Sequence, residues 1–109
     1  MKKKKLLKLD ISVDPYPVNL VYYRGPGEMF AKEMKKKYNM DLVTDCKGYF
    51  LDFEDGNMVI WTEVGNIYHI IHECLHAVES IMEFISQAQL DEPGAYLMEY
   101  LVKKCKEVG

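Results

Sequence analysis

The sequence VGNIYHIIHECLHAVESIMEFISQ spans residues 64–87 and has the periodicity of one long amphipathic helix. Its apolar residues recur at intervals of three and four, which places them along one face of a helix. The pattern therefore predicts a helix from residue 64 to about residue 87. The residues on its apolar face are Ile67, Ile70, Ile71, Leu75, Val78, Ile81, Met82 and Ile85.

Residues 72–76 of this predicted helix read His-Glu-Cys-Leu-His, an H-E-x-x-H pattern. His72 and His76 are four residues apart, so their imidazoles lie one above the other and can bind one metal ion. Glu73 leans toward the same edge, where it can accept a proton from a metal-bound water. We therefore predict a zinc site with these histidines as ligands and Glu73 as the general base. The competing interpretation is two partly buried histidines on a packed helix with a solvated Glu73.

Two neighbours of this pattern have simpler interpretations. His69 lies three residues before His72 and shares roughly its face, so it could be an alternative ligand, but we expect a surface or packing residue near the helix start. Cys74 lies between the two motif histidines in sequence and points to another face. We expect it to be a small core residue.

The chain before residue 64 predicts several strands and one helix. Apolar and polar residues alternate over 5–13 and over 49–54, which is typical of half-buried strands, and the spacing over 28–38 is helical. Asp55-Gly56 separates residues 49–54 from the β-branched and aromatic run 58–62, and a D-G pair in that position is a strong hairpin signal. The remaining predicted strands are 18–23 and 41–45.

The C-terminal residues predict a second helix over 95–106, with Pro93 suited to a first helical turn and lysines at the C-terminal end. The order is then strands, helix, strands and two helices. We expect an α+β fold in which a small, mostly antiparallel sheet packs on the H-E-x-x-H helix, followed by the C-terminal helix. The 109 residues form one predicted domain, 1–109, with residues 1–5 frayed.

Composition and charge exclude several classes of partner. The net charge of −3 predicts no nucleic-acid partner, and the lysine clusters 2–5 and 35–37 are expected to be solvated surface. Three cysteines without paired spacing indicate a reducing compartment. No apolar run approaches the roughly 18 residues that span a bilayer, so we expect no membrane partner. The predicted location is the cytoplasm, that of the host if a phage encodes the protein.

A catalytic zinc usually has three protein ligands and one open position, so the two histidines need a third partner. Glu79 and Glu83 continue the histidine stripe, but three ligands on one straight helix diverge too far for one tetrahedral ion. Acidic residues on or beside the next helix could fold back instead. These candidates are Asp91, Glu92 and Glu99.

The His-Glu-Cys-Leu-His segment, followed about fifteen residues later by Glu-Pro-Gly-Ala-Tyr-Leu at 92–97, resembles the gluzincin-type zinc metallopeptidases. The resemblance covers residues 57–102, and the short chain resembles the single-domain minigluzincins, which have a zincin-like fold. The pairing is also similar to small uncharacterised H-E-x-x-H proteins of phages and prophages. This resemblance implies Glu92 as the third zinc ligand beside His72 and His76, with Glu73 as the general base. It further implies that strand 49–54 or strand 58–62 receives the substrate as an added strand.

The expected helix lengths favour a different third ligand. A regular helix to Gln87 runs about 17 Å past His76 at 1.5 Å per residue. A tight hairpin would then bring Glu99 closer to the histidines than Glu92, so both remain candidates. Tyr96 and Tyr100 on the same predicted helix are expected to be packing residues, with oxyanion stabilisation as the alternative.

The leading functional hypothesis is a zinc-dependent hydrolase, a minimal metallopeptidase that acts on a peptide or protein through metal-activated water. The alternative is a non-catalytic zinc-binding structural or interaction protein, a phage-type accessory factor on a degenerate peptidase scaffold, because 109 residues leave little room for a deep cleft. A metal-free helical protein with a chance motif is the third hypothesis.

Overall fold

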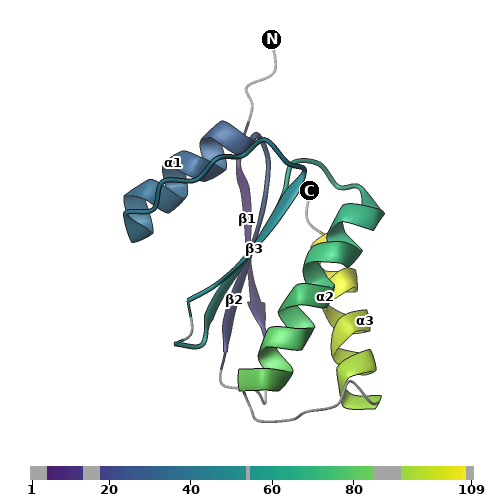
Figure 1. The fold of residues 1–109 in the computed structure, drawn as a ribbon. Helices are drawn as coiled ribbons and strands as arrows, with labels where there is room; N and C mark the ends of the chain where they lie inside the picture. Colours follow the sequence, from purple (N-terminus) through teal and green to yellow (C-terminus); the bar gives the residue numbers. More distant parts are fainter. Residues whose placement is uncertain (1–4, 14–17, 54, 85–91, 108–109) are drawn as a thin grey trace.

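The computed structural model describes residues 5–13, 18–53, 55–84 and 92–107, and for residues 84 and 92–95 it describes the backbone alone. The chain alternates short strands with helices (Figure 1). In chain order the elements are β1 (Leu7–Ser12), β2 (Asn19–Arg24), α1 (Gly27–Tyr38), β3 (Gly48–Asp52), β4 (Asn57–Thr62), α2 (Ile67–Phe84) and α3 (Glu92–Glu107).

The strands form one mixed sheet in the order β1-β2-β4-β3. Strands β1 and β2 pair antiparallel, as do β3 and β4, whereas β2 and β4 pair parallel. The predicted α+β class with a mostly antiparallel sheet is therefore confirmed. The Asp55-Gly56 hairpin is confirmed as well: the Asp55 carboxylate accepts a hydrogen bond from the Asn57 amide at 3.0 Å, and Gly56 has a positive φ of 91°.

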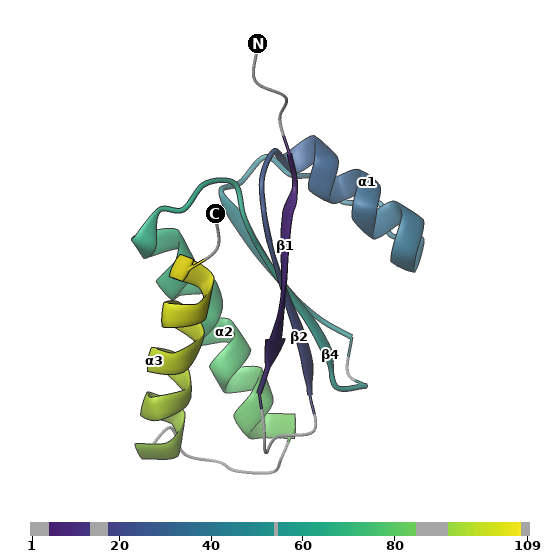
Figure 2. The same ribbon diagram turned by 180° about the vertical axis from the view of Figure 1, so that it is seen from behind.

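Helices cover both faces of this sheet. Helices α2 and α3 lie side by side on one face, and α1 lies on the other face at one end of the strands (Figure 2). Helix α2 contacts β3 and β4, while α3 contacts α2 and β1. Strand β3 is therefore the edge strand beneath α2, and α3 lies toward the opposite edge of the sheet.

Each face of the sheet has its own core, because successive strand residues point to opposite sides. Tyr22 of β2 points into the core under α2 and α3, whereas Tyr23 points into the core under α1. In the α1 core the rings of Phe30 and Trp61 are stacked with centroids 5.1 Å apart. The α2–α3 core is formed by apolar residues that include Ile11, Leu20, Ile60, Ile70, Val78, Ile81, Leu97 and Leu101.

The predicted strand over residues 41–45 is wrong. Helix α1 ends at Tyr38 and is capped by Asn39, which takes the left-handed conformation with φ 55°, and residues 39–46 have no regular structure. Leu42 and Cys46 pack against the α1 core, but Val43 is 70% exposed. The apolar residues in this segment are thus accounted for by packing against a helix-covered core and not by pairing in the sheet.

The two C-terminal helices differ from their predicted ends by a few residues. Helix α2 begins at Ile67, where the Asn66 side chain accepts a hydrogen bond from the Tyr68 amide at 2.9 Å, and its described part ends at Phe84. Helix α3 begins at Glu92, three residues before the predicted start. None of the helices in the described residues has both the length and the apolar character that crossing a bilayer requires.

Candidate metal centre

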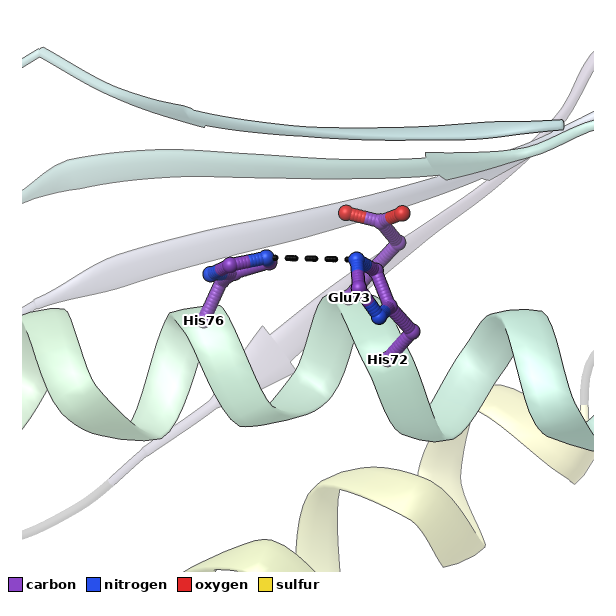
Figure 3. Close-up of side chains that lie close together, drawn as sticks. All are labelled: His72, Glu73 and His76. Atoms are coloured by element: carbon purple, nitrogen blue, oxygen red, sulfur yellow. Dashed lines mark hydrogen bonds between the residues drawn. The ribbon is translucent and has the colours of Figure 1, made fainter. Parts of the chain in front are cut away.

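Helix α2 brings the H-E-x-x-H side chains together by its periodicity. Ile70, Cys74 and Ala77 bury one face of the helix against the sheet and α3, which leaves the face with His72 and His76 exposed to solvent. Glu73 follows His72 in the chain and so lies at the border between these faces, where it is 7% exposed. The three side chains leave α2 on its sheet side, with α3 on the opposite side of the helix (Figure 3).

The two imidazoles have a geometry that fits a metal ion. Their Nε2 atoms lie 3.3 Å apart, and the two ring planes cross at 82°. A tetrahedral zinc with Zn–N bonds of 2.0–2.1 Å would hold two nitrogens about 3.3–3.4 Å apart. The candidate ligand atoms of His72, Glu73 and His76 all lie within 4.8 Å of one another. The arrangement can therefore place two nitrogen ligands and a carboxylate around one divalent cation.

Strand β3 lies beside the side chains of Glu73 and His76. The ring of Phe50 lies nearly parallel to that of His76, with centroids 6.3 Å apart and an interplanar angle of 18°. Gly48, two residues earlier on the same face of β3, lies directly against the Glu73 side chain. Neither residue was among the site residues expected from sequence. The sequence places Gly48 and Phe50 two residues apart, and so on the same face of a strand. How that strand aligns with α2 depends on tertiary packing.

Burial sets the electrostatics of Glu73. Desolvation of its carboxylate raises the pKa of Glu73 above its usual value, and the nearby His72, His76 and His69 partly oppose this shift. A carboxyl group whose pKa is raised toward neutrality holds a transferred proton more readily than a solvated one does. The environment thus suits a group that accepts a proton from one atom and returns it to another.

The third ligand expected from sequence is not among the described side chains. Glu92 starts α3, but its side chain lies outside the described residues, so its role stays a prediction. Glu99 is exposed on α3 and is not part of the metal-competent cluster of the described residues. The same holds for Glu79 and Glu83 on α2.

The structure also shows the environments of Tyr100, Tyr96 and Cys74. The Tyr100 hydroxyl donates a hydrogen bond of 2.6 Å to the Ser12 carbonyl of β1, which fits its expected packing role. Tyr96 is 67% exposed, so the packing role expected for it is wrong. Cys74 is fully buried with its Sγ 3.9 Å from that of Cys105, so the expected core role of Cys74 is confirmed.

The two motif histidines are exposed to solvent. Three hollows of about 530, 510 and 420 Å³ occur elsewhere, next to α1 and next to α3, and none is lined by His72, Glu73 or His76. We identify the site by its ligand chemistry and not by concavity, because a bare hollow binds nothing without suitably placed polar groups.

Comparisons with protein-family models, with curated proteins and with solved structures give no match. The resemblance to gluzincins therefore depends on the motif residues alone. Independently of that resemblance, the geometry supports a His-Glu-His group on α2 that could hold a metal ion.

Proposed function

We propose that this protein is a zinc-dependent hydrolase, a minimal metallopeptidase that cleaves a peptide or protein. His72 and His76 would bind the metal through Nε2, with Glu92 as the third ligand by resemblance. The observation that carries the proposal is the 3.3 Å separation of the two Nε2 atoms, together with the buried Glu73 carboxylate beside them. A hydrogen bond between the two imidazoles has the same separation, so the metal content of the protein decides between the two.

The chemistry can be divided between the metal and the chain. Zinc, when bound, lowers the pKa of a coordinated water toward neutrality and polarises a carbonyl group. Glu73 would remove the proton of the attacking water and deliver it to the leaving amine. Its buried position keeps the carboxylate beside the imidazoles.

The sheet offers a place for an extended substrate. Of the two strands considered for substrate pairing, β4 lies between β2 and β3 and has both edges occupied, whereas β3 is the edge strand beside the site. A peptide added to β3 would run past His76 and Glu73 with its backbone hydrogen-bonded to the sheet. Strand β3 is thus the better candidate for peptide binding.

The first test of this proposal measures metal content. Purified wild-type protein should contain about one zinc per chain by elemental analysis, and His72→Ala and His76→Ala should each remove most of it, because solvent cannot replace an imidazole ligand without a large loss of affinity. His69→Ala, on the same helix but outside the cluster, is the matched control and should keep its zinc. Stoichiometric zinc in both ligand variants would contradict the proposed site.

The second test separates catalysis from binding. Glu73→Gln should keep the zinc and lower the hydrolysis of a labelled, denatured polypeptide at least about 100-fold, because the amide cannot accept the proton. Undiminished turnover would exclude Glu73 as the base.

The exposure of His72 and His76 favours a second candidate function, a non-catalytic zinc-binding structural or interaction protein. Among the described residues, none of the three hollows next to α1 and α3 is lined by the motif side chains. Stoichiometric zinc in the wild type without any hydrolysis, together with loss of stability on chelation, would support that function in place of the hydrolase.

A further inference from the structure

We propose that Gly48 is a positioning residue for Glu73: its bare Cα leaves the notch in β3 that holds the Glu73 carboxylate beside the two imidazoles. The inference rests on the proposed role of Glu73 as a base. It assigns a function to a residue of the opposite layer, far from the motif in sequence.

The notch is defined by three close approaches. A Cβ added to Gly48 would lie 2.8 Å from Oε2 of Glu73 and 3.1 Å from its Cγ. It would also lie 3.0 Å from the carbonyl oxygen of Trp61, in the neighbouring strand β4. Contacts this short lie inside the van der Waals separation of about 3.5 Å, so the atoms would have to move apart.

The atoms in this contact differ in how easily they move. The Trp61 carbonyl belongs to β4, which is held between β2 and β3 by backbone pairing. The Glu73 side chain has rotatable bonds and open solvent beyond the histidines, since His72 and His76 are exposed. A methyl group at position 48 would therefore displace the Glu73 carboxylate rather than the sheet, and would move it away from its place beside the imidazoles.

The backbone conformation of residue 48 does not require a glycine. Gly48 is the first residue of β3, pairs with Thr62 in an antiparallel register, and is not among the described residues with positive φ. Alanine is acceptable there to the backbone, and glycine in a strand costs stability through its flexibility. The remaining structural reasons for glycine are the space occupied by Glu73 and the close approach of the Trp61 carbonyl.

A stability cycle on the metal-free protein tests the contact without relying on activity. Gly48→Ala should be less favourable in the wild-type background than in a Glu73→Ala background, with the two Tm shifts differing by about 4 °C, because only in the first background does the added methyl force the Glu73 side chain out of its packed position. The Trp61 carbonyl contact is present in both backgrounds and cancels in the comparison. Equal shifts in the two backgrounds would overturn the proposal.

Glu79→Ala provides the matched control for this cycle. Glu79 is an exposed glutamate of the same helix and does not contact Gly48. Gly48→Ala should therefore produce the same Tm shift with or without Glu79. A difference as large as that found with Glu73 would mean that the cycle reports helix stability in general, and it would also overturn the proposal.

Kinetic measurements test the positioning role directly, and they include a variant in which the carboxylate at position 73 is on a shorter side chain. Gly48→Ala should lower kcat at least about 10-fold with zinc content and KM unchanged, because a misplaced base affects the chemical step and not binding. Adding Glu73→Asp, which withdraws the carboxylate from the filled notch, should raise kcat above that of Gly48→Ala. Unchanged kcat in Gly48→Ala would refute the positioning role while leaving the hydrolase intact. If the wild type does not hydrolyse polypeptides, the proposed function fails, and the stability cycle still decides whether Gly48 positions Glu73.

Discussion

Tyr22 is a fully buried side chain whose hydroxyl lies in a polar chain between the sheet and α3. Its oxygen is 2.5 Å from Oγ1 of Thr62 and accepts a hydrogen bond of 3.0 Å from Nε of Arg24. Burial raises the pKa of Tyr22 above its ordinary value, although both hydrogen bonds oppose the shift. The unfolded chain therefore releases this proton at a lower pH than the folded protein does.

This difference predicts a pH dependence of stability. The stability contributed by the raised pKa is fully present below about pH 10, the unfolded value, and is lost as the pH rises through the folded value. At pH 7, Tyr22→Phe should lower the free energy of unfolding by ~1–3 kcal/mol, because two polar partners lose their bond. The gap between wild type and variant should narrow at pH 11 in urea titrations, whereas a constant gap would contradict the assignment. Tyr68→Phe, in an exposed ring, is the control.

Among single residues, the motif side chains were the most predictable. The pairing of His72 with His76 follows from the 3.6-residue period alone, which is a local property of any helix. The contact of Gly48 with Glu73 has no local signature, because it joins residues 25 positions apart through the packing of α2 on β3.

At the scale of elements, the end of α1 depends on one residue in an unusual conformation. Asn39 has φ 55°, and its amide donates a hydrogen bond of 3.0 Å to the Lys35 carbonyl. Asparagine and glycine tolerate this left-handed region, whereas a β-branched residue does not. The cap stops the helix and directs the chain back toward β3.

The cap gives a graded prediction for substitutions at this position. Asn39→Gly should leave stability within ~0.5 kcal/mol, while Asn39→Val should cost ~1–2 kcal/mol, because its Cβ clashes in the left-handed conformation. Urea unfolding followed by circular dichroism would measure both. Equal stability of the two variants would show that the cap does not limit α1.

Elements with a clear period were predicted well, and the predicted strand that the structure does not show is the one over residues 41–45. Alternation correctly predicted β1 and β3, and the three-four spacing correctly predicted α1 and α2. Within residues 41–45, Leu42 packs against the α1 core while Val43 is exposed, so these apolar residues occur without a strand.

At the scale of the whole molecule, Arg24 joins the sheet to the C-terminal helix. Its guanidinium donates a hydrogen bond of 2.7 Å to the Cys105 carbonyl of α3 and another to the Tyr22 hydroxyl. The cation also lies over the Tyr22 ring at 5.5 Å from the centroid. Helix α3 is thus held by a charge-assisted contact as well as by its apolar face.

Removal of this contact should loosen α3 selectively. Arg24→Met keeps an unbranched apolar stem but leaves the Cys105 carbonyl without this donor, so we expect a loss of ~1–3 kcal/mol. Hydrogen exchange should rise in α3 more than in β2 and β4. Lys104→Met is the control, because the exposed Lys104–Glu107 pair at 3.8 Å contributes at most ~1 kcal/mol. Uniform exchange across the molecule would contradict a specific role in holding α3.

The sequence by itself determined the features that depend on local periodicity. These are the α+β class, the bounds of most elements to within a few residues, the Asp55-Gly56 hairpin and the convergence of His72 with His76. Each follows from a repeat of two or 3.6 residues or from the steric preferences of a single turn, which act between near neighbours in the chain.

The tertiary structure alone decided which strand lies beside the histidines. The parallel pairing of β2 with β4 leaves β3 at the edge under α2 and places Gly48 and Phe50 against Glu73 and His76. These contacts join distant segments, and their alignment follows from how two layers bury the largest apolar area together. The pattern of residues along the chain does not show how the helix layer and the sheet align.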